Sequence, residues 1–328
     1  MRIMVVGDIH LNEWQEFAKY KCVKGYCWNS RLYEQIEVLK QILDYIKTHK
    51  PHMVVILGDV FHRYLPDTQK VFYSFLSKIS APEVVVLVGN HDLVDESKRK
   101  HKIVLHAGSV VNEPKVLEKN GIRYGFVPFY RDVEFVDFTI KNMQADVVFA
   151  HVDIMGFYYS EFGVSPDDLR RFKLFVNGHY HNPQRIGNIL LAGAVMDFSF
   201  SDVGHNQKGV WLIEDTEIVK FLPLKYKRFI AVSEEELQNV DTDKYYVKVL
   251  VKEAPKQVKE NVRYQFSTPA KELSDLPSFP ELLEKYANMY ENPQLAKEFI
   301  SSVGKIQFDL SLKMNEKQEN DISYEDLF

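Results

Sequence analysis

Five short runs of apolar, mostly β-branched residues constrain the fold of this 328-residue chain more than any other feature. Each run is continuously apolar rather than alternating, which is typical of strands that are covered on both faces. Between the runs, apolar residues recur every three or four positions and predict helices over Arg31–Thr48 and Thr68–Ile79. This alternation predicts an α/β fold in which helices flank the sheet. The predicted strands are Ile3–Val6, Met53–Leu57, Val84–Val88, Val147–Ala150 and Leu174–Val176.

The second half of the chain predicts further units. Glycine-punctuated β runs from Leu190 to Leu222 predict a second sheet that packs against the first. Farther on, Lys244–Val251 and Val262–Phe266 predict strands of a small α+β unit, and a stretch rich in Pro and Ser predicts a linker. We expect four parts: a large domain over 1–223, a small α+β domain over 224–270, a linker with helices over 271–303, and a short strand-like run with an acidic tail over 304–328.

Composition excludes a disordered or fibrous chain, because 45% of the residues are hydrophobic and 27% are charged. No apolar run reaches the roughly 18 residues that a membrane helix needs, and the N-terminus lacks the pattern of a signal peptide. We therefore expect a soluble, cytoplasmic protein. Cys22 and Cys27 are too few for a disulfide framework or a zinc site, so we expect them to be reduced thiols.

Residues that can bind a metal ion follow every one of the five predicted strands. The carboxyl ends of strands in α/β folds meet at one crevice, so we expect these residues to lie together. Six of the eleven histidines fall there, and imidazole mixed with carboxylate suits Mn²⁺, Fe²⁺ or Zn²⁺ rather than Ca²⁺. One such residue is a weak signal, whereas the ordered set predicts a metal site. The segments are Gly7–His10, Gly58–His62, Gly89–Asp92, His151 and Gly178–His181.

As an ordered set, the motifs DxH, GD, GNHD, H and GHxH resemble those of the calcineurin-like metallophosphoesterases, from residue 1 to about residue 220. His62 follows Asp59 by three residues, and a small domain and terminal helices come after the large domain. Both features are similar to the nuclease subunits of SbcCD-type DNA repair and recombination complexes, including the short phage versions. The resemblance implies a two-sheet metallophosphoesterase sandwich flanked by helices, with a small α+β domain that caps the DNA and with C-terminal helices.

The resemblance also implies a ligand set for two divalent metal ions. These ions are expected to be Mn²⁺, with Mg²⁺, Fe²⁺ and Zn²⁺ as alternatives. Two cations ~3.5–4 Å apart need a bridging carboxylate to screen their repulsion, and such a pair suits the hydrolysis of a phosphodiester. By resemblance, Asp8, His10 and His181 would hold one ion, Asn90, His151 and His179 would hold the other, and Asp59 would bridge the two.

Three residues near the ligands are candidates for catalysis. His91 is the candidate general acid for the departing 3′ oxygen, and a role in orienting the phosphate is the alternative. Asp92 would orient or charge-stabilise that imidazole, or it would cap a turn instead. By resemblance, His62 would position the DNA strand for exonuclease action, and an exposed loop imidazole is its alternative. The other histidines are expected to be surface or packing residues: His49, His52, His101, His106 and His205.

The activity that the resemblance implies is that of a Mn²⁺-dependent DNA nuclease. Such a protein would degrade duplex ends exonucleolytically and nick single strands, together with an ABC-type coiled-coil ATPase, in double-strand-break repair, recombination or replication. A bimetal phosphatase or small-molecule phosphodiesterase is one alternative, and a non-catalytic DNA-end tether is another. The family also implies a homodimer formed through helices near Thr68–Ile79 and Ser97–His106.

Contacts with DNA and with the ATPase are expected at two further sets of residues. The candidate DNA contacts are basic residues near the metal-binding segments: Lys19, Lys21, Lys24, Lys98, Arg99 and Lys100. The first three lie among aromatic residues that could equally pack in the core, and the last three could form a solvated helix face. Apolar stripes on the C-terminal helices are candidates for docking onto the ATPase or for folding back on the small domain. They contain Leu282, Leu283, Tyr286, Tyr290, Phe299 and Ile300.

The net charge of -5, from 41 Lys+Arg and 46 Asp+Glu, does not exclude DNA as the substrate. The last 27 residues carry three Lys and six Asp+Glu, so the rest of the chain has a net charge of only -2. Two divalent ions would reverse that sign. We therefore expect DNA affinity to depend on bound metal, local basic loops and a partner more than on a broadly basic surface.

Overall fold

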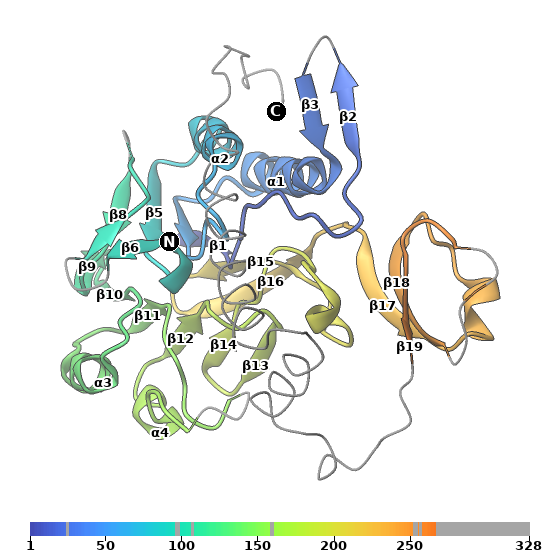
Figure 1. Ribbon diagram of the computed structural model, residues 1–328. Helices are drawn as coiled ribbons and strands as arrows, with labels where there is room; N and C mark the ends of the chain where they lie inside the picture. The colour runs from blue at the N-terminus through green and yellow to red at the C-terminus, as the bar shows by residue number, and fades with distance from the viewer. Residues whose placement is uncertain are drawn as a thin grey trace, which may run out of the picture. The chain divides into compact units, whose positions relative to one another are not determined.

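Two six-stranded sheets form the centre of the protein (Figure 1). The computed structural model describes residues 1–23, 26–95, 99–105, 108–157, 161–251, 255 and 258–266. The first sheet has the order β16-β15-β1-β4-β5-β8, and the second has the order β13-β14-β12-β11-β10-β9. Strands of the first sheet are β1 (Arg2–Val6), β4 (Met53–Ile56), β5 (Glu83–Leu87), β8 (Ser109–Val111), β15 (Gly209–Glu214) and β16 (Glu217–Pro223). Those of the second are β9 (Lys115–Lys119), β10 (Ile122–Val127), β11 (Val147–Ala150), β12 (Leu174–Asn177), β13 (Gln184–Ile186) and β14 (Ile189–Leu191).

The main core lies between the two sheets. Ile3, Val55 and Leu87 from the first sheet belong to the same buried cluster as Phe126 and Phe149 from the second. Helices α1 (Ser30–His49) and α2 (Pro66–Ser77) cover the outer face of the first sheet, and α3 (Val133–Asn142) and α4 (Pro166–Leu169) cover that of the second (Figure 1). With both faces buried, the central strands need apolar residues at every position, which explains their continuous apolar runs. The predicted sandwich flanked by helices is confirmed.

The distribution of strands between the sheets differs from the prediction. The run at Gly209–Glu214 does not start a second sheet, because β15 pairs antiparallel with β1, Met4 opposite Leu212. The second sheet instead contains two of the five predicted strands, β11 and β12, which pair parallel with each other. Strand β10 was not predicted, because Arg123 and Gly125 interrupt its apolar pattern.

Smaller β elements complete the described part of the chain. A three-stranded sheet contains β17 (Arg228–Val232), which was not predicted, and the predicted strands β18 (Tyr245–Val251) and β19 (Val262–Phe266). A hairpin of β6 (Leu93–Asp95) and β7 (Lys100–His101) includes part of Ser97–His106, so the helix expected there is wrong. The ranges 271–303 and 304–328 lie outside the described residues, and the predicted domain boundaries stay predictions. Within the described ranges, no helix is both long and apolar enough to cross a membrane.

The two cysteines lie in a second hairpin, formed by β2 (Tyr20–Val23) and β3 (Tyr26–Asn29). Cys22 and Cys27 are directly opposed in its register, and Cys27 is disulfide-bonded. The prediction of reduced thiols is therefore wrong. The hairpin explains the difference, because it places Cys22 and Cys27 opposite each other on neighbouring strands although they are five positions apart in the sequence.

Replacing Phe149 by Ala tests the core between the sheets. Phe149 is fully buried and its ring centroid lies 5.5 Å from that of Phe126, so we expect the free energy of unfolding to fall by about 3–5 kcal/mol. The matched control is Phe138→Ala on α3, where the side chain is 67% exposed and the expected change is within about 0.5 kcal/mol. Denaturant unfolding measures both changes, and equal effects of the two variants would contradict this assignment of the core.

Candidate metal centre

The predicted metal ligands lie together at the carboxyl ends of five strands. In the first sheet, β1 is followed by Asp8 and His10, β4 by Asp59, and β5 by Asn90. In the second sheet, β11 is followed by His151, and β12 by His179 and His181. Five of these side chains line a cavity of about 300 Å³: His10, Asp59, Asn90, His179 and His181. Asp8 and His151 are fully buried beside them. The two sheets therefore deliver one cluster of carboxylate, amide and imidazole groups.

Asp8, His10 and His181 form the first group of possible ligands. Each contributes one ligand atom, and these atoms all lie within 4.8 Å of one another. The Nε2 atoms of His10 and His181 are only 3.1 Å apart. Asp8 Oδ2 and His10 Nδ1 are buried without a hydrogen-bond partner among the residues that the structure describes. Buried polar atoms are normally satisfied, so the orphaned Asp8 Oδ2 and the converging Nε2 atoms fit a bound cation, while His10 Nδ1 lies on the other side of its ring.

Asp59, His151 and His179 form the second group, with the same spacing limit of 4.8 Å. Asn90 joins it, because its Oδ1 lies 3.0 Å from His151 Nε2 and 3.2 Å from His179 Nδ1. Asp59 Oδ2 is 3.5 Å from His151 Nε2 and 3.4 Å from His10 Nε2 of the first group. Asp59 thus lies between the two groups, in the position that a bridging carboxylate requires.

The backbone at the cluster is strained. His10, Asp59 and His179 all have positive φ values, of 47°, 45° and 66°. For residues other than glycine, this conformation costs of the order of 1–3 kcal/mol each and is typical of functional sites. Close packing explains why glycine stands at two positions beside the ligands. A Cβ atom on Gly89 would lie 2.2 Å from Asp59 Oδ1, and one on Gly178 would lie 2.8 Å from Asp8 Oδ1.

Partners of the imidazoles fix their orientation, and several were not predicted from the sequence. His179 Nε2 lies 3.0 Å from Asp153 Oδ1, and His151 Nδ1 lies 2.9 Å from the carbonyl oxygen of Leu57. Asp202 Oδ1 is 3.6 Å from His181 Nδ1. Such partners normally set the tautomer of a metal-binding imidazole. Asp153 follows His151 by two residues, whereas nothing in the local sequence indicates Asp202.

A family model for calcineurin-like phosphoesterases matches residues 1–183. The chain belongs to this family. It is a metal-dependent phosphodiesterase hydrolase, which confirms the predicted reaction class. The family uses divalent metal ions, and the donor set described above fits them.

The chain is also similar to individual proteins and to a solved structure. The phosphoesterase is 23% identical over 291 residues to exonuclease subunit 1 of enterobacteria phage T4, covering 79% of each chain. It is 24% identical over 296 residues to a subunit of the nuclease SbcCD of Staphylococcus epidermidis, covering 76% of each chain. Among solved structures, it is similar to YfcE, a phosphoesterase from E. coli, at 15% identity and a TM-score of 0.36 over 68% of this chain and all of that one.

Electrostatics at the cluster of the phosphoesterase favour a cation. Burial lowers the pKa of His151, but the carboxylates of Asp59 and Asp8 outweigh burial and raise that pKa to about 9. Burial raises the pKa of Asp59, yet the imidazoles of His151 and His10 hold it well below its usual range. The carboxylate therefore stays ionised, and His151 attracts either a proton or a metal ion.

His91 and His62 lie beside the first group of ligands. The ring of His91 is 4.8 Å from that of His10 and is stacked on that of His62 at 5.0 Å. The backbone N–H of His91 donates to Asp59 Oδ1 at 2.9 Å. His62 in turn lies 4.5 Å from the ring of Trp14, and burial together with the charge of His91 lowers its pKa to about 4. Both imidazoles line the same 300 Å³ cavity as the ligands.

Asp92 has the contacts of a turn-capping residue, one of its two predicted alternatives. Its carboxylate is fully buried and accepts hydrogen bonds from the backbone N–H groups of Phe61, at 3.2 Å, and Gly89, at 3.0 Å. Burial, with the charge of Asp59, raises the pKa of Asp92 to about 7. Asp92 therefore ties the loop that follows Asp59 to the loop that carries Asn90.

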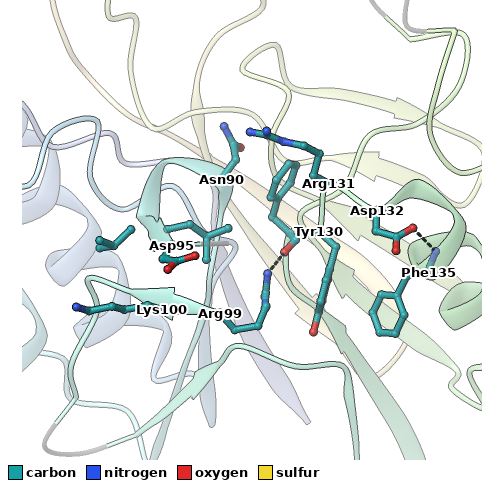
Figure 2. Close-up of a pocket in the computed structure, with 11 residues that line it drawn as sticks. Asn90, Asp95, Arg99, Lys100, Tyr130, Arg131, Asp132 and Phe135 are labelled. Carbon is teal, nitrogen blue, oxygen red and sulfur yellow. Dashed lines mark hydrogen bonds between the residues drawn. The ribbon is translucent and has the colours of Figure 1, made fainter. Parts of the chain in front are cut away.

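The predicted DNA contacts have different surroundings. Lys19 pairs with Glu260 at 2.5 Å. The half-buried Arg99 donates to the carbonyl oxygens of Phe129 and Asn112, each at 2.7 Å, so its guanidinium supports two loops. Lys100 is exposed and lines a cavity of about 1390 Å³ that also contains Asn90 (Figure 2). The side chain of Lys21 and residues Lys24, Lys98, Leu282, Leu283, Tyr286, Tyr290, Phe299 and Ile300 lie outside the described part of the chain.

Metal binding by the phosphoesterase should compete with protons. Below about pH 9 His151 carries a proton that must leave before its Nε2 can bind a metal ion, so affinity should rise with pH by up to about tenfold per unit for each proton released. Calorimetric titration with Mn²⁺ at pH 6, 7 and 8 measures the affinity. Buffers with different ionisation enthalpies count the protons, and an affinity that does not change over this range would contradict the assignment of His151.

Proposed function

We propose that this phosphoesterase is a Mn²⁺-dependent DNA nuclease that degrades duplex ends and nicks single strands. The observation that carries the proposal is the position of His91 and His62 in the cavity of the metal cluster, which shares Asn90 with a much larger cavity. That cavity is lined by three basic residues, two carboxylates and several aromatic and apolar side chains (Figure 2). The charged residues are Arg99, Lys100, Arg131, Asp95 and Asp132. A groove of this size and lining suits a polynucleotide better than a small ester. Two relatives, one named as an exonuclease subunit and one as a nuclease subunit, support the same substrate class.

Each residue has a distinct task in this proposal. Two bound divalent ions would activate a water molecule and stabilise charge on the phosphoryl oxygens. Asp8, His10 and His181 would hold one ion, and Asn90, His151 and His179 the other, with Asp59 shared between them. Asn90 provides a neutral oxygen, which leaves the site more positive toward a phosphodiester. His91 would donate a proton to the departing 3′ oxygen, and His62, stacked on it, would position the strand.

The donor set favours a group of metal ions that includes Mn²⁺. Four imidazoles accompany two carboxylates and one amide in the cluster. Mg²⁺ favours oxygen ligands and retained water, whereas Mn²⁺, Fe²⁺ and Zn²⁺ accept this mixture of nitrogen and oxygen. We place Mn²⁺ first among these ions.

The wider role that we propose is DNA repair, recombination or replication in the cytoplasm, together with an ABC-type coiled-coil ATPase. Both relatives are named as subunits, which supports a partner. The proposed docking residues lie in the helices predicted within 280–303. A homodimer is part of the proposal, and of its two predicted interface helices α2 is the one that forms.

A comparison of three substrates tests the proposed function. With Mn²⁺ present, we expect turnover of linear duplex DNA and of single-stranded DNA well above that of a small chromogenic phosphodiester, because only polymers fill the groove beside Asn90. Initial rates measured at matched phosphodiester concentrations give the comparison. Turnover of the small ester alone would favour a small-molecule phosphodiesterase. Binding of DNA ends without any cleavage would favour a tether.

Variants separate chemistry from metal binding in the same assay. His91→Ala should keep both ions while cleavage of DNA falls by about 10²–10⁴-fold, the range typical of a lost general acid. His52→Ala is the matched control, because the exposed His52 lies at the amino end of β4, whereas Asp59 follows the carboxyl end of that strand. Its Nδ1 accepts a hydrogen bond from the backbone of Arg2. Full activity of His91→Ala would remove His91 from the acid role.

A further inference from the structure

A group of charged side chains with almost no exposure to solvent lies behind His181. Lys208 and Asp197 are 0% exposed and Asp202 is 1% exposed. Burying a lysine or a carboxylate is costly unless each charge is paired and hydrogen-bonded. The metal cluster does not use these three residues as ligands, so their burial needs another explanation.

Lys208 holds the main chain at His181. Its Nζ donates to the carbonyl oxygen of His181 at 2.6 Å and to Asp202 Oδ1 at 3.2 Å, and it lies 3.0 Å from His205 Nδ1. An ammonium group has three donors, and two of them find oxygen acceptors here, in His181 and Asp202. His205, expected to be a surface or packing residue, is thus part of this buried network.

Asp202 faces the side chain of the same histidine. Its Oδ1 is 3.6 Å from His181 Nδ1, while its Oδ2 accepts hydrogen bonds from the backbone N–H groups of Phe198 and Ser199, at 2.9 and 3.2 Å. The ring of Phe198 packs edge-on against the His181 imidazole at 5.6 Å. The carboxylate is therefore fixed by the backbone on one side and faces the imidazole with its other oxygen.

Arg228 completes the charge balance of this network. Arg228, on β17, has its Nε 3.3 Å from Asp197 Oδ2, and its Nη2 donates to the carbonyl oxygen of His205 at 2.7 Å. Lys208 and Arg228 together neutralise Asp197 and Asp202. Because the charges of this network already cancel, it does not need a bound cation. In this respect it differs from the metal cluster.

We propose that Asp202 and Lys208 are positioning residues for His181. Asp202 holds its imidazole and Lys208 holds its carbonyl oxygen. As a result, His181 Nε2 stays directed at the metal ion that Asp8 and His10 also bind. The 3.1 Å approach of His181 Nε2 to His10 Nε2 is the arrangement that this support maintains. Carboxylate partners of metal-binding histidines typically affect metal affinity by about 10–100-fold. The proposal rests on the family's metal chemistry and on His181 as a ligand, and it does not depend on which phosphodiester is cleaved.

Two variants test the proposal through Mn²⁺ affinity rather than activity. Asp202→Asn removes the carboxylate, and the double variant Asp202→Asn with Lys208→Met removes both members while keeping the network neutral. In each, we expect the ion at Asp8, His10 and His181 to bind about 10–100-fold more weakly, and the other ion to bind as in the wild type. Calorimetry gives the two affinities. Electron paramagnetic resonance distinguishes a coupled Mn²⁺ pair from a single Mn²⁺.

Controls separate positioning from stability and from ligand assignment. Lys173→Met removes one member of an exposed pair, 3.2 Å from Asp146, and should change neither affinity. Thermal unfolding of the double variant without metal should stay close to the wild type, because its buried charges remain balanced. If the double variant binds both ions normally, or loses both equally, the positioning role is wrong. If His181→Ala still binds two ions, the ligand assignment itself has failed.

Discussion

The carboxylate of Asp59 lies between two groups of ligands, and much of the structure depends on that position. Its Oδ2 is within 3.5 Å of imidazole nitrogens that belong to different groups, one from the loop after β1 and one from the end of β11. These two strands belong to different sheets. A shared carboxylate therefore requires both sheets to present their carboxyl ends at the same edge of the sandwich and at a fixed separation.

Rigid packing between the sheets supplies that fixed separation. The interface is filled by fully buried aliphatic and aromatic side chains, and close-packed interiors tolerate little displacement. Such a rigid framework can hold unfavourable local features, among them the positive φ values of His10, Asp59 and His179 and the orphaned Asp8 Oδ2. These features are concentrated where a cation would be bound, which is typical of a functional site rather than of a structural core.

Local sequence patterns were sufficient for five of the central strands and for the segments that carry the ligands. Continuous apolar runs followed by polar residues indicate both a buried strand and the residues at its end, so the convergence of the five metal-binding segments could be predicted. The choice of seven ligands among them came from the resemblance to the calcineurin-like metallophosphoesterases. The assignment of strands to sheets could not be predicted, because pairing such as that of β1 with β15 joins residues about 200 positions apart.

Supporting residues were harder to predict for the same reason. Asp202 and Lys208 contact His181 from a later segment that carries no metal-binding motif, and Arg99 resembles a surface residue although its guanidinium is used inside the protein. Their roles depend on tertiary contacts rather than on spacing in the sequence. The three-stranded sheet is linked to this support through Arg228 and Asp197, so the metal centre and β17 share one buried network.

Anomalous diffraction at the manganese absorption edge, from crystals of the protein soaked in Mn²⁺, tests the central claim most directly. The account predicts two peaks about 3.5–4 Å apart, with a carboxylate oxygen of Asp59 within bonding distance of both. One peak should lie among Asp8, His10 and His181, and the other among Asn90, His151 and His179. A single peak, or two peaks that do not share Asp59, would contradict it.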